Sequence, residues 1–159
     1  MVLIRIVGYP RTMGQRSDVM AAAENRLETA EFRLTPARRK VIKTLSGSAG
    51  PQSAADLAAA LQGDVPVSSL YRTLAVLERS NVIERFPDQT GVARYELAQW
   101  LTGHHHHMTC LGCGATSDVE VPGDLEATVE DIVLELGRRF DFDVTGHRLD
   151  LQGMCSRCR

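Results

Sequence analysis

Apolar residues recur with a helical period between residues 21 and 80, and turn residues divide this segment into short helices. Thr35 and Pro36 supply an N-cap and a first helical residue, and Ser53 supplies a second N-cap. Gly47 and Gly63 stand where two of the helices end. The pattern therefore predicts helices over residues 21–32, 36–47, 54–61 and 66–80.

A hairpin is predicted directly after these helices. Residues 82–97 form two extended segments around the turn sequence Pro-Asp-Gln-Thr-Gly. In the preceding helix, Leu70, Leu74 and Leu77 fall on one face and form an apolar stripe. This order of elements is typical of a winged helix-turn-helix, whose second helix enters the DNA major groove while the hairpin lies against the backbone.

The remainder of the chain alternates between short strands and one helix. It predicts strands around 108–110, over 117–121 and over 142–151, with a helix over 124–139. We therefore expect an α+β protein, with an N-terminal winged helix-turn-helix followed by a C-terminal α/β domain. The expected divisions are a flexible leader (1–20), a winged-helix domain (21–97), a hinge (98–103) and a metal-binding domain (104–159).

Charge and ligand-forming residues are unevenly distributed along the 159 residues. The net charge is −2, but residues 1–103 carry 13 Lys/Arg against 10 Asp/Glu, whereas residues 104–159 carry 5 against 10. All five histidines and all four cysteines lie in the acidic part. No apolar run reaches the roughly 20 residues of a membrane helix, and the apolar start is short and interrupted by Arg5. We expect a cytoplasmic protein that does not enter membranes.

The last of the N-terminal helices carries a candidate DNA-binding face. Ser69, Arg72 and Thr73 are predicted to point away from the leucine stripe, with Tyr71 near its boundary. Small polar and aromatic side chains can contact thymine methyl groups or phosphates, and arginine can bond guanine or phosphate. The alternative is a solvated face of a small helical domain.

Four cysteines form two Cys-x-x-Cys pairs separated by 41 residues, Cys110/Cys113 and Cys155/Cys158. Such a pair can direct both sulfurs at one ion from a tight turn, and Gly112 and Gly114 provide the required freedom of the backbone. Two pairs complete a tetrahedral four-cysteine zinc site. Disulfides or inert buried thiols are the alternatives, but a disulfide framework is typical of small secreted chains.

Four consecutive histidines, His104 to His107, precede the first cysteine pair. If this run is extended, His104 and His106 point to one side and His105 and His107 to the other, so that one run would serve two metal sites. A remnant of an expression tag or a solvated polar loop would also explain it. Mixed imidazole and carboxylate ligation suits Zn2+ or Fe2+. The candidate partners are Glu84, Glu96, Glu126 and His147.

With these features together, the chain resembles the ferric-uptake-regulator family of metal-dependent repressors, including its zinc-uptake branch. The resemblance covers roughly residues 20–159, and the matching sequences are RLTPAR (33–38), SSLYRTL (68–74), GHHHHMTCLGCG (103–114) and CSRC (155–158). It implies a homodimer with an N-terminal winged helix and a C-terminal α/β dimerisation domain. It also implies that metal near the hinge draws the two DNA-binding domains into a clamp.

The resemblance implies three metal sites. The cysteines match a structural zinc site, His104, His106, Glu126 and His147 match a dimerisation-domain site, and His105 and His107 match a hinge sensory site. Two ligands that relatives often supply to the hinge site are missing, namely a histidine near Pro51 and a cysteine near Ala98. Glu84 and Glu96 are the expected substitutes, although the segment after Glu96 is about two residues longer here than in the iron branch.

The function expected from these features is a zinc-responsive repressor of metal-uptake genes that binds a roughly palindromic DNA operator and is not an enzyme. An iron-responsive repressor of the same family, with Fe2+ at the regulatory site, is the first alternative. A zinc-dependent hydrolase is a second, but the chain has no His-Glu-x-x-His or deaminase signature. A zinc store would explain the ligands and leave the winged helix without a purpose.

Overall fold

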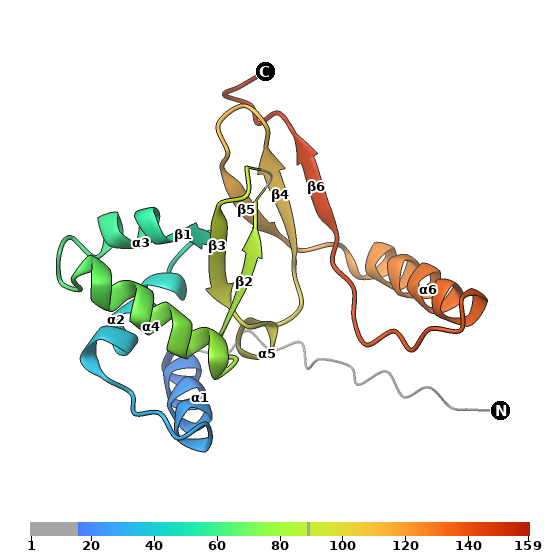
Figure 1. Ribbon diagram of the computed structural model, residues 1–159. Coiled ribbons are helices and arrows are strands. Elements are labelled where there is room, and N and C mark those ends of the chain that lie inside the picture. Colours follow the sequence, from blue (N-terminus) through green and yellow to red (C-terminus); the bar gives the residue numbers. More distant parts are fainter. Residues whose placement is uncertain (1–15, 89) are drawn as a thin grey trace. The chain divides into compact units, whose positions relative to one another are not determined.

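The computed structural model describes residues 16–88 and 90–159, which form two compact units. One unit ends at His104 and the other consists of His105–Arg159. Figure 1 shows the helices and strands of both units. No helix in the described ranges is long and apolar enough to cross a membrane.

The N-terminal unit begins with helices whose first residues follow the capping signals in the sequence. The Thr35 hydroxyl accepts a hydrogen bond from the Arg38 backbone N–H, and Ser53 and Asp56 form a reciprocal capping box. The first helix begins at Arg16, so the predicted leader is too long by several residues, and residues 1–15 of it lie outside the described residues. The helices are α1 (Arg16–Thr29), α2 (Pro36–Leu45), α3 (Ala54–Ala60) and α4 (Val67–Arg79).

A three-stranded antiparallel sheet completes the N-terminal unit. Its order is β1-β3-β2, and the β2–β3 hairpin is the predicted wing. In place of an irregular linker, a short helix α5 (Gln99–Thr102) follows, and its first backbone N–H donates to Glu84 Oε1 at 3.3 Å. The strands are β1 (Gln52–Ser53), β2 (Ile83–Pro87) and β3 (Ala93–Leu97).

The core of this unit lies under α4, where the leucine stripe is buried as predicted. Tyr71 and Arg72 on the opposite side are exposed. Thr73 was expected on the outer face but is only 6% exposed. Its position, three residues after Leu70 and four before Leu77, places it within the inward face of a helix with 3.6 residues per turn.

The C-terminal unit contains a second three-stranded sheet, in the order β5-β4-β6. Strand β4 (His106–Cys110) pairs antiparallel with β5 (Thr116–Val119) and parallel with β6 (Asp150–Gly153). The predicted strand over 142–151 is therefore wrong over residues 142–149. An apolar pattern alone does not form a strand, because a strand needs a neighbouring strand to pair with. Only Asp150–Gly153 pairs with β4.

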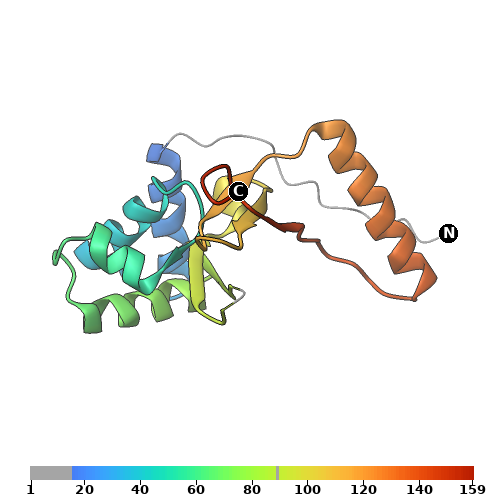
Figure 2. The ribbon, with the colours of Figure 1, turned by 90° about the horizontal axis from the view of Figure 1, so that it is seen from above.

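The rest of the described C-terminal unit buries almost none of helix α6 (Gly123–Arg139). Among its 17 residues, all of them described, only Glu126 is buried. Leu125, Ile132 and Leu136 are each about half exposed. They recur at i, i+7 and i+11 and thus lie along one face. Figure 2 shows the helix standing to one side of its sheet. A face of this kind needs another surface to cover it.

Two substitutions on α4 test whether its two faces contribute differently to the free energy of unfolding. Leu74 is 1% exposed, so Leu74→Ala should lower the free energy of unfolding by about 2–5 kcal/mol through lost burial and a cavity. Tyr71 is 56% exposed, and Tyr71→Ala should change that free energy by less than about 0.5 kcal/mol. Urea unfolding of both variants measures the difference, and equal losses would contradict the assignment of the two faces.

Candidate metal centres

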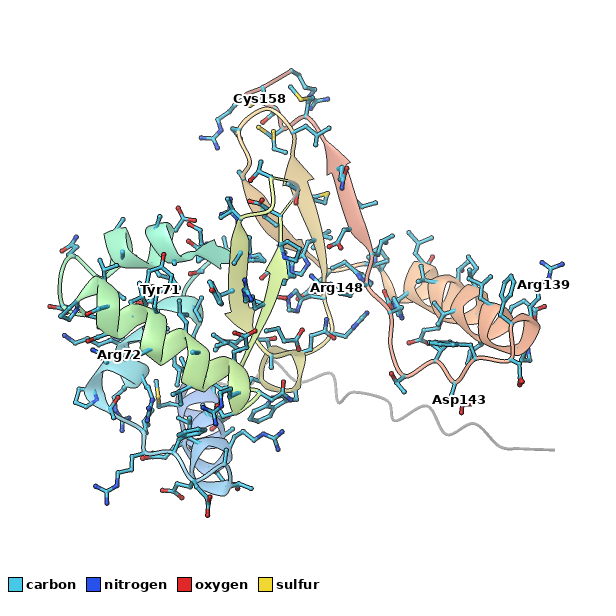
Figure 3. The ribbon with its side chains drawn as sticks, viewed as in Figure 1. Tyr71, Arg72, Arg139, Asp143, Arg148 and Cys158 are labelled. Atoms are coloured by element: carbon cyan, nitrogen blue, oxygen red, sulfur yellow. The ribbon has the colours of Figure 1, made fainter. Side chains whose placement is uncertain are left out.

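The four cysteine sulfurs come together at one end of the C-terminal sheet. Their Sγ atoms all lie within 4.8 Å of one another, and none forms a disulfide. The parallel register pairs Cys110 with Gly153, which carries the second pair to the first. Figure 3 labels Cys158 beside the sulfur atoms at this end of the sheet. Four sulfurs at such spacing fit a tetrahedral structural zinc ion.

Two glycines make the close approach of the two pairs possible. A Cβ atom on Gly112 would lie 2.8 Å from Cys158 Cβ and 3.1 Å from its Sγ, so a side chain there would separate the pairs. Gly114 adopts φ +70°, a conformation that other residues rarely enter. Gly112 is thus needed for space, whereas Gly114 is needed for its backbone conformation.

Backbone N–H groups prepare this cluster for a cation. The Cys155 backbone N–H donates to Cys110 Sγ at 3.3 Å, and this hydrogen bond is the largest cause of the lowering of the pKa of Cys110 to about 6. Neighbouring sulfurs, that of Cys155 first, raise the pKa of Cys158 to about 12. These backbone N–H groups therefore favour the thiolate of Cys110, and thiolate is the form that binds zinc.

A second cluster forms around Glu126, the one buried residue of α6. Its Oε2 lies 2.8 Å from His106 Nε2, and its Oε1 lies 3.0 Å from His147 Nε2. The Leu149 backbone N–H donates to His106 Nδ1 at 3.2 Å, which fixes the orientation of this ring. Two imidazoles and a carboxylate that is 7% exposed offer nitrogen and oxygen ligands suited to zinc.

A third cluster lies on the other face of β4. His107 Nε2 is 3.7 Å and His105 Nε2 is 4.0 Å from the same oxygen, Asp118 Oδ1. Asp150 Oδ1 lies 3.4 Å from His107 Nδ1, the nitrogen that faces away from Asp118. A carboxylate in that place orients an imidazole ligand. Two histidines and one carboxylate could hold Zn2+ or Fe2+.

Sequence reasoning missed Asp118, although the information was in the strand pattern. Asp118 stands directly opposite His107 in the β4–β5 register. A strand over 117–121 was predicted, but the number of residues in the turn fixes which residue faces which histidine. Counting back from a turn over Leu111–Ala115 would have identified this carboxylate.

The remaining predicted ligands belong to the N-terminal unit. His104 is its last residue, and its Nδ1 lies 3.2 Å from Gln99 Oε1. Glu96 is 7% exposed on β3, opposite Glu84 on β2. The membership of His104 in the Glu126 cluster, and of Glu84 and Glu96 in the hinge site, remains a prediction.

The predicted DNA-contacting residues lie on α4, as Figure 3 shows for Tyr71 and Arg72. The Arg72 guanidinium donates to Ser69 Oγ at 3.3 Å, so these two side chains share one surface. Thr73 does not belong to it, because its side chain is buried. The outer side of α4 therefore carries exposed Tyr71 and Arg72 and half-buried Ser69, and their contact with DNA remains a prediction.

Comparison with known proteins shows the family of this chain. The sequence model described as "Ferric uptake regulator family" matches residues 29–152. The ferric uptake regulation protein of Bacillus subtilis is 29% identical over 140 residues, covering 85% of this chain and 91% of the relative. The peroxide operon regulator of the same organism is 29% identical over 144 residues, covering 89% and 93%.

A solved structure also shares the fold. The Helicobacter pylori ferric uptake regulator, whose structure is described as revealing three functional metal-binding sites, superposes with a TM-score of 0.72 at 22% identity. The superposition covers 94% of this chain and 97% of that one. It confirms the predicted α+β fold with N-terminal helices and a sheet-containing C-terminal domain.

Removal of one sulfur tests the four-cysteine cluster. Cys113→Ser should eliminate one zinc equivalent and the cooperative unfolding of the C-terminal unit, because structural zinc contributes on the order of 10 kcal/mol to folding in small systems. Ser156→Ala, within the second pair but without a ligand atom, is the matched control and should retain both. The measurements are metal content by atomic emission and thermal unfolding by circular dichroism. Full zinc content in the Cys113 variant would exclude this cluster as a four-sulfur site.

Proposed function

Because this chain belongs to the ferric uptake regulator family, we propose that it is a zinc-responsive DNA-binding repressor of metal-uptake genes. Members of the family are metal-responsive transcription regulators rather than enzymes, as expected from the sequence, and the hydrolase alternative is therefore abandoned. A regulator that acts on DNA belongs where the DNA is, so the proposal includes a cytoplasmic location.

One observation supports a role as a metal sensor beyond what family membership alone implies. His106 and His107 are adjacent in β4, yet His106 contacts Glu126 and His107 lies beside Asp118. Successive residues of a strand point to opposite faces, so two ligand clusters share one short strand. An ion held on one face would therefore be coupled to an ion on the other through a rigid backbone. This arrangement suits a sensor better than a store, which needs no such coupling.

The nature of the ligands favours zinc as the sensed metal. The Glu126 cluster supplies two imidazole nitrogens, and zinc binds nitrogen ligands more tightly than ferrous iron does. Zinc also imposes no geometry of its own, so a buried and crowded cluster can hold it. We propose that His104 completes this cluster as a fourth ligand, as the resemblance implied.

Iron is the second candidate, and a specific observation favours it. His105, His107 and Asp118 form a set of two histidines and one carboxylate, which is the ligand set of many non-haem Fe2+ sites. The relatives named as iron and peroxide regulators are consistent with this reading. A further carboxylate from Glu84 or Glu96 would shift the set towards oxygen ligands, which Fe2+ prefers.

Dimerisation is part of the proposal, and α6 supplies the surface for it. Regulators of this family are dimeric DNA-binding proteins. Leu125, Ile132 and Leu136 form an exposed apolar face, and a second copy of α6 and its surroundings would cover it. A symmetric dimer presents two copies of α4, so the operator should be roughly palindromic. Ser69, Tyr71 and Arg72 would contact it.

Switching is proposed to depend on the cluster around His107. Metal binding there stabilises the DNA-competent arrangement only if its affinity for that arrangement is higher than for the inactive one. A ligand from the N-terminal unit, Glu84 or Glu96, would provide this difference, since it would tie the wing region to the C-terminal unit.

The test is a titration of DNA binding against free metal. A duplex selected from a random library by protein loaded with Zn2+ or, in a parallel selection, with Fe2+ is labelled, and its anisotropy is followed in buffered subnanomolar Zn2+ and, separately, in micromolar Fe2+ without oxygen. The proposal expects activation by zinc. The double variant His105→Ala, His107→Ala should remain a folded dimer with its four-cysteine zinc but should bind this duplex no better with metal than without.

The outcomes separate the two candidates. Activation by Fe2+ with no response to buffered Zn2+ would replace the zinc proposal with the iron one. A double variant that responds to metal as the wild type does would remove His105 and His107 from the sensory site. Zinc content serves as the control for folding, because the cysteine cluster does not include either histidine.

A further inference from the structure

We propose that Arg94 is a positioning residue for DNA binding. Its side chain holds the tip of the wing against the N-terminus of α3. The inference rests on the proposed function, in that the wing is taken to lie against the DNA backbone. It concerns the wing, defined here as β2, β3 and the turn between them. Nothing in the sequence pattern pointed to this residue, because Asp56, the partner that ties it to another element, is 38 positions away.

Arg94 joins two carboxylates that belong to different elements. Its Nε lies 3.0 Å from Asp88 Oδ2 in the wing turn, and its Nη1 lies 3.0 Å from Asp56 Oδ2 in α3. The Arg94 and Asp88 side chains are 18% and 13% exposed, so water only partly screens this ion pair, whereas the Asp56 side chain is 47% exposed and its pair is screened more. A guanidinium is planar and has several fixed donors, which lets one side chain hold two acceptors in a defined geometry.

At the wing end, Asp88 organises the turn as well as the ion pair. Its Oδ1 accepts hydrogen bonds from the Thr90 backbone N–H at 2.9 Å, the Thr90 hydroxyl at 2.7 Å and the Val92 backbone N–H at 3.0 Å. Its Oδ2 is the oxygen that contacts Arg94. The Thr90 hydroxyl and then Arg94 lower the pKa of Asp88 to about 2, so the carboxylate is charged throughout the neutral range. One side chain thus shapes the tip and anchors it.

At the other end, Asp56 is the third residue of α3 and the acidic member of its capping box with Ser53. Its Oδ2 accepts from the Ser53 backbone N–H at 2.9 Å and from the Ser53 hydroxyl at 2.6 Å. Ser53 and Arg94 are register partners in the β1–β3 pair, which brings the guanidinium to the capping box. Arg94 therefore connects the wing tip to the start of the helix-turn-helix pair.

In the described part of the wing, the tip is a two-stranded ribbon. Strand β1 pairs with β3 only through Gln52–Tyr95 and Ser53–Arg94, so β1 does not extend along residues 86–88 and 90–93. An isolated two-stranded hairpin is marginally stable in water. Without the ion pairs, the tip could sample several orientations, and contacts that need a fixed distance between wing and α4 would be lost.

The charges of these side chains allow a clear test, because a pure charge effect and a positioning effect predict opposite changes in DNA affinity. Two carboxylates and one guanidinium carry a net charge of −1 in a domain that binds a polyanion, which costs binding energy unless the geometry compensates. Asp88→Asn removes one negative charge but keeps an oxygen that can accept the hydrogen bonds of the turn. If charge alone mattered, this substitution would strengthen DNA binding. If Arg94 positions the tip through Asp88, it must weaken binding.

The experiment measures the dissociation constant of the selected duplex for the zinc-loaded full chain at two salt concentrations. Asp88→Asn and Arg94→Gln should each weaken binding about tenfold, which corresponds to ~1.4 kcal/mol. Arg94→Lys should recover part of the loss, because a lysine can pair with one carboxylate at a time. Asp64→Asn is the matched control: it removes a carboxylate from an exposed pair with Lys40 in the same unit and should not weaken binding.

Each result has a distinct meaning. Unchanged or tighter binding by Asp88→Asn would overturn the inference, even if Arg94→Gln binds weakly, since Arg94 would then act by contacting phosphate directly. In that case the salt slope should fall by about one unit for Arg94→Gln alone. Failure of the wild type to select any duplex would instead contradict the proposed function. Zinc content and thermal unfolding identify a variant that has merely unfolded.

Discussion

The pairing of β6 with β4 is the constraint on which the C-terminal unit depends. All four residues of β6 are exposed, so burial of apolar side chains does not hold this strand in place. Closing the long loop between the strands costs conformational entropy. A zinc ion held by the four cysteine sulfurs at the end of the pair would offset this cost, because structural zinc contributes directly to folding. The β4–β6 register at this end also determines where Asp150 and His147 lie.

That register places the histidines. With Cys110 beside Gly153, Asp150 lies beside His107, and the segment before β6 brings His147 towards Glu126. The period of two residues in β4 then separates His106 from His107. A structural site of sulfur ligands thereby supports two clusters of nitrogen and oxygen ligands.

Local signals in the sequence predicted most of the fold, because helix caps and apolar stripes involve residues a few positions apart. Thr35, Ser53 and the Leu70–Leu77 stripe are of this kind. Thr73 was misplaced although its helical spacing is local, whereas the residues that were missed depend on partners in other elements. Asp118 became visible only with the β4–β5 register, and Arg94 with the pairing of Ser53, 41 positions earlier. The cysteines and histidines were predictable as ligands, whereas their grouping needed the structure.

Strand β4 is proposed to divide its histidines between two separate metal sites. Equilibrium dialysis of His106→Gln, His107→Gln and the double variant against zinc tests it most directly, since glutamine keeps the volume of the side chain but is a poor ligand. Each single variant should lose one bound ion and keep the cysteine-bound zinc, and the double variant should lose two. A single substitution that removes both ions, or a double variant that loses no more than either single one, would contradict the separation of the two sites.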